Sequence, residues 1–446
     1  MAIIVFEARI TPPEPLGRQD TDSTVNRTIL RRRRKTLQQS PSLSARYGAM
    51  AIALLIAASG CGTLTRNAVP VDRMHDAEIP GFADVRAWSG RISEDFQADF
   101  VQSVRDERHG EFPTDGNGIP IYEGLALSGG GSNGAFGAGF LYGWSQTGLR
   151  PDFKLVTGIS TGALIAPFAY LGSDFDEQLK EVYTTITSEN ILQRRNVFSI
   201  LFKSESLAKT DPLTQLIEKH INEDTLRAVA ERHDRGHRLY IGTTHMDAQH
   251  LIVWNMGLIA KRQSLEALDL FREVMLASAS IPVAFPPVLI EVEIDGKLHD
   301  EMHADGGTLT QVFFYSGTLD IGAGRREVYG DDFQPSGGGV YIIRNGQVQP
   351  EPIQVDRNLA AISSRAVDTM IKTAVVGDLY RIFAFARRDD IGFNYTGIPD
   401  DYEPQSTGLF DQAEMNRLFQ IGYQLGMSSN PWRSTPPGYE AMTITQ

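Results

Sequence analysis

The stretch LVTGISTGA, residues 155–163, decides the fold. Its first three residues are apolar or β-branched and predict a short strand, while the residues after Gly162 predict a helix. Gly-x-Ser-x-Gly between a strand and a helix is the sequence of a nucleophile elbow, a strained turn that presents a serine. Gly158 and Gly162 supply the small neighbours that this turn requires. Ser160 is therefore the candidate nucleophile, and the alternative is an ordinary glycine turn.

A glycine loop, LSGGGSNG at residues 127–134, lies upstream of this turn. Three consecutive glycines let the backbone approach a ligand with its N–H groups aimed inward, as an oxyanion hole requires. The same residues fit the dinucleotide fingerprint Gly-x-Gly-x-x-Gly, which expects an acidic residue at the far end of the next strand. Asp152 comes before that strand, so the loop favours an oxyanion hole over a nucleotide site.

A general base for the serine is harder to identify. None of the nine histidines lies beyond His303, although an α/β-hydrolase triad has the chain order Ser, acid, His. His299 and His303 fall in what we expect to be a short polar loop. Five other histidines lie in polar stretches that we expect to be exposed: His220, His233, His237, His245 and His250. Asp305, followed by Gly306 and Gly307, offers a different base, a carboxylate on a tight turn that acts directly on the serine.

Together these segments resemble the patatin-like phospholipase family. The signatures of that family are a glycine-rich oxyanion loop, then Gly-x-Ser-x-Gly, then Asp-Gly-Gly. The stretch ASASIPVAFPP at residues 277–287 also resembles the family's segment ahead of the aspartate. The resemblance extends over residues 124–318, and it implies a three-layer α/β fold with an acyl-hydrolase activity.

The resemblance implies a Ser–Asp dyad that works through an acyl-enzyme, with no metal and no cofactor. Ser160 would attack the ester carbonyl, and Asp305 would accept its proton and then activate water. The amides of Gly130, Gly131 and Ser132 would hold the oxyanion. The implied site also includes Gly129 and Gly134 in the oxyanion loop, Gly158 and Gly162 in the elbow, and Gly306 and Gly307 in the aspartate turn.

One residue departs from the family's pattern. Asn133 stands where the glycine loop of the family usually has Arg or Lys. A hole built from backbone N–H groups does not need that side chain, but a contact with a phosphate head group could. The sequence therefore favours an acyl-ester hydrolase more strongly than a phospholipase.

Two further groups of residues have alternative interpretations. In an extended segment His299, Glu301, His303 and Asp305 would share one face and could bind a metal; a polar loop beside the aspartate turn is the favoured interpretation, because the dyad needs no metal. The aromatic clusters at residues 313–315 and 383–385 could line an acyl groove, but core packing is the favoured interpretation.

Strands and helices alternate from residue 124 onward, which predicts an α/β fold with a central, mostly parallel sheet between layers of helices. The expected strands are 124–128, 155–157, 239–244, 251–255, 288–294 and 340–343, with a hairpin turn at 295–296. The expected helices are 135–147, 163–170, 265–277 and 359–385. We expect a catalytic domain over residues 121–320 and a C-terminal part, 321–446, that packs on it.

The charge of the chain limits its partners. The net charge is −13, and because the first 46 residues are basic, the remainder is more acidic still. A body this acidic is a poor candidate for binding nucleic acid through phosphates, and anionic lipid would repel it.

A targeting segment offers another route to a membrane. A basic stretch precedes an apolar run at residues 49–58, too short to span a bilayer, and ASGC at 58–61 resembles a bacterial lipobox. Residues 1–60 are then a signal segment, Cys61 carries the lipid, and 61–120 form a tether and N-terminal extension. A buried helix with an incidental thiol is the alternative.

These features favour one function over two others. We expect a lipid acyl-ester hydrolase anchored in the bacterial cell envelope, on the periplasmic side of the outer membrane, since Gly62 is not the aspartate that retains lipoproteins at the inner membrane. The alternatives are an esterase for small esters and a catalytically silent protein that binds lipid or a partner. The oligomeric state has no signature in the sequence.

Overall fold

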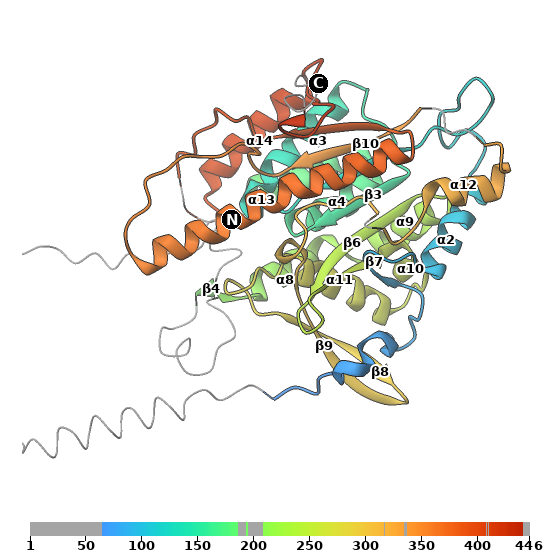
Figure 1. The fold of residues 1–446 in the computed structure, drawn as a ribbon, viewed down its shortest axis with the longest axis horizontal. Coiled ribbons are helices and arrows are strands. Elements are labelled where there is room, and N and C mark those ends of the chain that lie inside the picture. Colours follow the sequence, from blue (N-terminus) through green and yellow to red (C-terminus); the bar gives the residue numbers. More distant parts are fainter. Residues whose placement is uncertain are drawn as a thin grey trace, which may run out of the picture.

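The computed structural model describes residues 65–185, 193–194, 208–315, 317–333, 337–406, 408 and 410–439. Within these residues a nine-stranded sheet has the order β1-β7-β6-β3-β2-β10-β11, and the β8–β9 hairpin is attached to β6 (Figure 1). The strands are β1 (Arg86–Trp88), β2 (Glu123–Leu127), β3 (Leu155–Ile159), β6 (Arg238–His245), β7 (His250–Asn255), β8 (Val288–Ile294), β9 (Lys297–Asp305), β10 (Gly339–Arg344) and β11 (Gly392–Gly397). Strands β4 (Gln193–Arg194) and β5 (Ala208–Lys209) form a separate pair.

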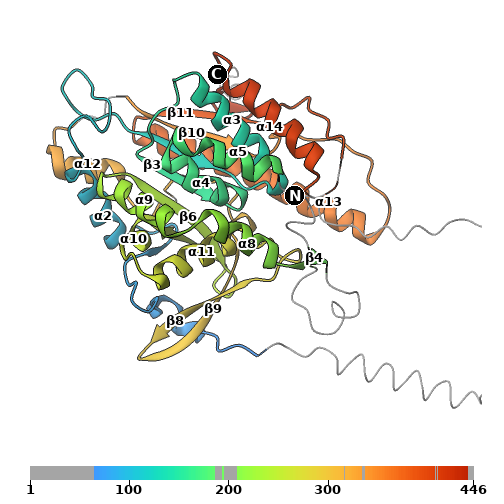
Figure 2. The ribbon, with the colours of Figure 1, turned by 180° about the vertical axis from the view of Figure 1, so that it is seen from behind.

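Helices cover both faces of the sheet. They are α2 (Glu94–Arg105), α3 (Gly134–Gln146), α4 (Thr161–Leu171), α5 (Asp176–Thr185), α8 (Asp211–His220), α9 (Glu223–Asp234), α10 (Met256–Lys261), α11 (Leu265–Ala279), α12 (Ile321–Tyr329), α13 (Leu359–Arg388) and α14 (Gln412–Gly426). Short 3₁₀ turns are η1 (Val71–Asp76), η2 (Gly131–Asn133), η3 (Ser173–Phe175) and η4 (Gly306–Thr308). Helices α2, α12 and α13 lie on the face seen in Figure 1, and Figure 2 shows α3, α4, α5 and α14 on the other.

The alternation of side chains along each strand explains these layers. Leu125 and Leu127 of β2 belong to the core cluster under α3, α4 and α14, whereas Ala126 between them belongs to the cluster under α2 and α13. Both faces are apolar, as expected for strands buried on both sides. The predicted three-layer α/β fold is confirmed.

The five central strands are parallel and set the position of every loop at their carboxyl ends. Strand β6 pairs in parallel with β3, β3 with β2, β2 with β10, and β10 with β11. Strands β7 and β1 add to the β6 edge in antiparallel fashion. The sheet therefore draws β1 from residues before 121 and β10 and β11 from residues after 320.

Most predicted elements are present with small shifts at their ends, but one prediction is wrong. Residues 297–305 form strand β9 instead of a short polar loop. This strand pairs with β8 from Lys297 to His303, and its first residues can be polar because they lie at the exposed end of the hairpin. Strand β11 and helix α14 are additions that the sequence analysis did not predict.

Helix α14 packs unusually closely on α3 through glycines. A Cβ atom added at Gly139 would lie 2.0 Å from the Phe419 carbonyl oxygen, and one added at Gly422 would lie 2.1 Å from the Phe136 carbonyl oxygen. Side chains at these positions would force the helix backbones apart. Because α3 begins at Gly134, this packing also fixes the end of the glycine loop.

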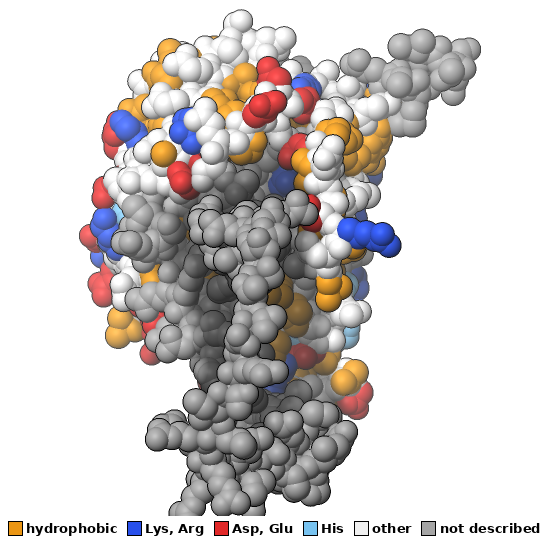
Figure 3. Space-filling model, turned by 90° about the vertical axis from the view of Figure 1, so that its left-hand side faces the viewer, with side chains coloured by type: hydrophobic (Ala, Val, Ile, Leu, Met, Phe, Trp, Pro, Cys, Tyr) orange, Lys and Arg blue, Asp and Glu red, His pale blue; other side chains and the backbone are white. Residues whose placement is uncertain are grey.

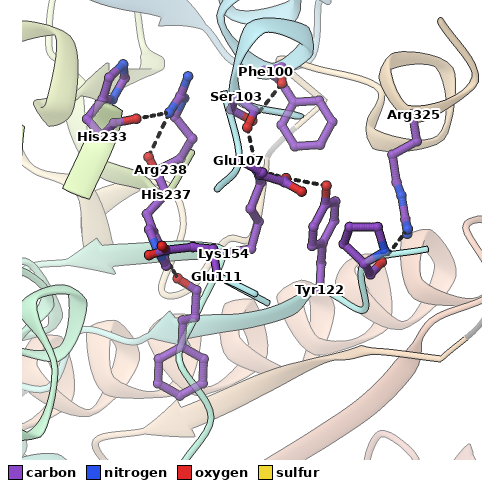
Figure 4. Close-up of polar contacts among 12 residues, drawn as sticks. Phe100, Ser103, Glu107, Glu111, Tyr122, Lys154, His233, His237, Arg238 and Arg325 are labelled. Atoms are coloured by element: carbon purple, nitrogen blue, oxygen red, sulfur yellow. Dashed lines mark hydrogen bonds and ion pairs between the residues drawn. The ribbon is translucent and has the colours of Figure 1, made fainter. Parts of the chain in front are cut away.

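A polar cluster at the amino ends of the parallel strands ties α2 to the sheet (Figure 4). The buried Lys154 amino group donates to the Ser103 carbonyl oxygen at 3.1 Å and to the Glu107 carboxylate at 2.5 Å. Burial lowers the pKa of Lys154 to about 7. Arg238, at the start of β6, donates to Asp99 at 2.6 Å. This cluster lies at the opposite edge of the sheet from Ser160, so we interpret it as structural.

The surface beyond the carboxyl edge includes the exposed first half of α13. Figure 3 views the molecule from the side to which α13 projects, and there hydrophobic, acidic and basic side chains are mixed. Leu359, Ile362 and Met370 of α13 are exposed, as are Ile353 and Val355 just before it. None of the described helices is long and apolar enough to cross a membrane.

Candidate active site

Ser160 occupies the sharp turn between β3 and α4. Its backbone has φ 55° and ψ −124°, a conformation that costs a non-glycine residue on the order of 1–3 kcal/mol and is typical of functional turns. A Cβ at Gly158 would lie 2.4 Å from the Gly162 carbonyl oxygen, and one at Gly162 would lie 2.3 Å from the Leu127 carbonyl oxygen. Both glycines are therefore required sterically, as the sequence analysis expected.

The amide of Ser160 is held by a serine that the sequence analysis did not single out. Ser278, at the end of α11, accepts a hydrogen bond from Ser160 N at 3.0 Å and donates to the Gly242 carbonyl oxygen at 2.7 Å. Ser280 is nearby, and its carbonyl oxygen accepts from Asp305 N at 2.9 Å. The stretch at 277–287 thus contacts both the serine turn and the aspartate turn, which only the tertiary structure reveals.

The sheet brings Asp305 to Ser160 through a change of partner along β6. Strand β6 pairs with β3 up to Gly242, opposite Ile159, and pairs with β9 from Thr243, opposite Asp305. Strand β9 therefore continues the line of β3 at the point where β3 ends. Asp305 follows Ile159 across the sheet, and its carboxylate lies near enough to Ser160 for the serine side chain to lower the pKa of Asp305.

The turn after Asp305 fixes the position of the carboxylate and shields it from solvent. The Gly307 amide donates to Asp305 Oδ1 at 2.7 Å. A Cβ at Gly306 would lie 2.5 Å from the Gly242 carbonyl oxygen, so the turn packs directly on β6. Burial raises the pKa of Asp305 to about 7, while the hydrogen bonds from Ser160 and Gly307 act in the opposite direction. A carboxyl group with such a pKa can accept a proton near neutral pH.

The glycine loop lies against the serine. A Cβ at Gly129 would be 3.3 Å from Ser160 Cβ, and one at Gly134 would be 2.1 Å from Thr161 Oγ1. None of the described residues accepts a hydrogen bond from the amides of Gly130, Gly131 or Ser132. These donors are at the start of η2 and α3, where unpaired N–H groups favour negative charge.

Gln311 connects the loop with the aspartate turn, and the sequence analysis did not find it. Its carbonyl oxygen accepts from the Gly129 amide at 2.9 Å, and its side-chain amide donates to the Gly307 carbonyl oxygen at 2.5 Å. Asp378 of α13 accepts in turn from Gln311 N at 2.7 Å. Gln311 has no motif of its own, so only its position between the two turns identifies it.

An apolar pocket opens at Ser160. Helices α4, α5, α8, α11 and α14 or the segments beside them contribute its lining, which includes Leu164, Val182, Leu213, Phe285 and Met415. Gly131 and Thr161 also line it, so the free amides of the loop face the same space as the serine. The aromatic residues 313–315 are buried in the core instead, as predicted.

The histidines do not contact Ser160. His303 is fully buried, lies 2.9 Å from Thr243 Oγ1 and 3.1 Å from Glu301, and burial lowers its pKa to about 4. The prediction of exposed histidines is wrong for three of the five: His233, His237 and His245 are buried. Each has one ring nitrogen facing a carboxylate from a distant segment: His233 lies 3.2 Å from Asp99, His237 lies 2.9 Å from Glu111, and His245 lies 3.7 Å from Glu301. A local sequence pattern does not reveal such partners.

The acidic groups that could be taken for metal sites are already paired. Glu301 forms an ion pair with Arg86 at 2.5 Å, so the segment from His299 to Asp305 is a buried strand with a neutralised carboxylate. Glu111, Asp152 and His237 also lie together, but Arg232 forms an ion pair with Asp152, and Arg235 lies 3.6 Å from Glu111. Cys61 and the segment before it lie outside the described residues.

Comparison with known proteins shows what the part of the chain that carries this site is similar to. Residues 125–315 match the family model "Patatin-like phospholipase". No curated protein sequence matches the chain. Among solved structures, VipD from Legionella pneumophila is 16% identical, with 72% of this chain and 70% of that chain covered and a TM-score of 0.37. The type III effector protein ExoU is 12% identical, with 70% and 55% covered and a TM-score of 0.19. Residues 125–315, which carry Ser160, Asp305 and the glycine loop, are thus similar to the patatin-like phospholipase domain.

Proposed function

We propose that this protein hydrolyses the acyl esters of lipids with Ser160 as nucleophile and Asp305 as base. The single observation that carries the proposal is that the sheet places the buried carboxylate of Asp305 beside Ser160, which itself lines an apolar pocket. The family match supports lipid hydrolysis in general, and the dyad and the substrate are our inference.

In the proposed reaction, Ser160 Oγ attacks the ester carbonyl carbon while its proton passes to Asp305. The tetrahedral oxyanion is held by the amides of Gly130, Gly131 and Ser132, and it collapses to the acyl-enzyme as Asp305 protonates the departing alkoxide. Asp305 then removes a proton from water, which attacks the acyl carbonyl carbon, and the second tetrahedral intermediate collapses as Asp305 returns that proton to Ser160 Oγ and the fatty acid leaves. Removing one oxyanion donor typically lowers the rate about 10²–10³-fold.

The pocket supports a long acyl chain as the substrate group. Its lining beside Ser160 is almost entirely apolar, and such a surface gains about 25 cal/mol for each Å² of acyl chain that it removes from water. Asn133, the departure in the loop, donates its backbone amide to the Gly130 carbonyl oxygen at 3.1 Å, and its side chain does not cap α3. The proposal therefore names the acyl chain and leaves the head group open.

We further propose that the enzyme is held at the bacterial cell envelope, on the periplasmic side of the outer membrane, by a lipid on Cys61. The acidic body makes a covalent anchor more plausible than electrostatic attraction to anionic lipid. Helix α13 follows β10, which is parallel to β3, so its exposed apolar first half lies at the same edge of the sheet as Ser160. Apolar side chains at this edge are compatible with contact to a lipid surface.

The test compares purified wild-type protein with Ser160→Ala on p-nitrophenyl esters of increasing chain length and on phospholipid vesicles. We expect activity that rises with chain length and is lost in Ser160→Ala, while Ser173→Ala, an exposed serine, keeps it. A preference for acetyl over long-chain esters would point to a small-ester esterase. A well-folded wild-type protein without activity on any ester would contradict the proposal and favour a silent lipid-binding protein.

A further inference from the structure

Arg344, at the end of β10, is a buried cation directly behind the glycine loop. Its side chain is almost completely buried, with 7% of its surface exposed, and its Nη1 donates to the Gly129 carbonyl oxygen at 2.7 Å and to Ser128 Oγ at 3.2 Å. None of the described carboxylates lies within ion-pair distance of it, Asp378 and Glu351 act on it only at longer range, and its Nε is buried without a hydrogen-bond partner. An unpaired buried charge is costly, so its presence calls for a compensating role.

The position of Arg344 follows from strand pairing. Strand β10 lies beside β2 with Ile343 opposite Leu127, so the next residue along β10 reaches the first residues of the loop. Asn345 holds the backbone there: its amide donates to Ser128 Oγ at 2.8 Å, and its side chain donates to the Ser128 carbonyl oxygen at 2.8 Å. Neutral hydrogen bonds from Asn345 thus hold Ser128 beside those that Arg344 donates to Ser128 and Gly129.

The contact to the Gly129 carbonyl has an electronic consequence. This carbonyl and the Gly130 N–H belong to the same peptide group. A cation that donates to the oxygen draws electron density from the nitrogen, and hydrogen bonds along such a chain strengthen one another. The Gly130 amide has no acceptor among the described residues, and its two neighbours lie at the site: a Cβ at Gly129 would be 3.3 Å from Ser160 Cβ, and Gly131 lines the pocket.

We propose that Arg344 is a positioning residue that strengthens the oxyanion hole by polarising the Gly129–Gly130 peptide. Its charge also adds a positive potential behind the developing oxyanion, in surroundings from which water is excluded. Burial lowers the pKa of Arg344 to about 10, so the side chain remains charged at neutral pH. This inference rests on the proposed function of Ser160 and the glycine loop.

The test replaces Arg344 by Met, Gln and Lys and measures kcat and KM on a long-chain ester. For Arg344→Met and Arg344→Gln we expect kcat to fall about 10- to 100-fold, somewhat less than for loss of an entire oxyanion donor, with KM changed less than about threefold. Gln can still donate a hydrogen bond to the Gly129 carbonyl oxygen, so a low kcat in Arg344→Gln would show that the positive charge itself is required. Arg344→Lys should recover most of kcat at neutral pH.

The Lys variant gives a second readout that a structural role would not produce. A lysine has an ordinary pKa of about 10.4, below that of arginine, and burial lowers it further. We expect kcat of Arg344→Lys to decline at a lower pH than that of the wild-type protein. A matched control is Arg325→Met, which removes another buried arginine whose guanidinium donates to the Pro120 carbonyl oxygen, far from the loop.

The outcomes separate the two proposals. Inactive wild-type protein would overturn the proposed function itself. With active wild-type protein, an unchanged kcat in Arg344→Met, or a loss that Arg325→Met reproduces, would overturn the role of Arg344. If Arg344→Met does not fold, Arg344→Lys and Arg344→Gln decide: equal activity of the two over the whole pH range would contradict a role for the charge.

Discussion

Asp305 combines two properties at the residue scale that explain how a carboxylate could serve as a base near neutral pH. Its carboxylate is buried in a turn, where it accepts a hydrogen bond from the Gly307 amide and lies close to Ser160. Burial raises its pKa to about 7, far above the ordinary value for aspartate. The same burial that makes the group basic also makes its charged form costly to the folded protein.

The pH dependence of catalysis follows from this pKa. Asp305 must be deprotonated to accept the serine proton, so kcat/KM should rise with pH to a plateau, with a midpoint near pH 7. A rate profile on a soluble ester between pH 5 and 9 measures it. A midpoint near 4, the ordinary value for aspartate, would show that the carboxylate is not shielded as described.

The same shift predicts that Asp305→Asn is inactive but more stable than wild type. Because the pKa of Asp305 is raised in the folded state, the wild-type protein loses stability as pH rises from about 4 to about 7. An uncharged asparagine removes this loss, so the variant should have a free energy of unfolding higher than that of the wild type by on the order of 3–4 kcal/mol at pH 8, and by little at pH 4. Urea unfolding of both proteins at the two pH values checks it; a variant less stable at pH 8 would contradict the assigned burial cost.

At the scale of elements, the glycine-lined contact between α3 and α14 supports the loop. Gly422→Val would add a side chain at a position where the Cβ atom alone would lie 2.1 Å from the Phe136 carbonyl oxygen, so the helices must separate. We expect a loss of about 3 kcal/mol or more in the free energy of unfolding, together with a lower kcat.

A glycine on α13 provides the matched control for this substitution. Gly377 has no atom within 4 Å of an added Cβ, so Gly377→Ala should stabilise the protein by about 0.5–1 kcal/mol and leave kcat unchanged. Chemical denaturation measures both variants. Equal effects of the two substitutions would contradict the importance of the close helix contact.

The elements also show which parts of the site the sequence could predict. Ser160, Asp305 and the glycine loop lie in turns whose residue types are dictated by backbone geometry, so they have local signatures. Ser278, Gln311 and Arg344 act through contacts between segments far apart in the chain, and no local pattern identifies them. Strand β9 was misread because its polar residues precede buried ones, which only the pairing with β6 and β8 explains.

At the scale of the whole molecule, the sheet assembles the site, and the proposed lipid anchor would determine where the protein is located. The sheet collects strands from residue 86 to residue 397, so the site depends on chain segments well outside the family match at 125–315. The acidic charge of the chain favours solubility of the body, and the proposed lipid on Cys61 would keep it near its substrate.

Replacing Cys61, the proposed lipid attachment site, tests whether membrane attachment and catalysis depend on separate parts of the chain. Cys61→Ser should move the protein from the membrane fraction to the soluble fraction of cells, while activity on a soluble ester stays within about twofold of wild type, because Cys61 lies outside the sheet and the pocket. Fractionation followed by immunoblotting measures the shift. Continued membrane association of the variant would show that another feature retains the protein.

The most direct test of the central claim is covalent labelling of the folded protein by a fluorophosphonate probe, located by peptide mass spectrometry. The Ser160–Asp305 dyad predicts one labelled residue, Ser160, with labelling abolished in Ser160→Ala and slowed at least about 10²-fold in Asp305→Asn, since the serine then lacks its base. The His303→Gln variant should be labelled at nearly the wild-type rate. Labelling of another residue, or a loss of labelling in His303→Gln as large as that in Asp305→Asn, would contradict the dyad.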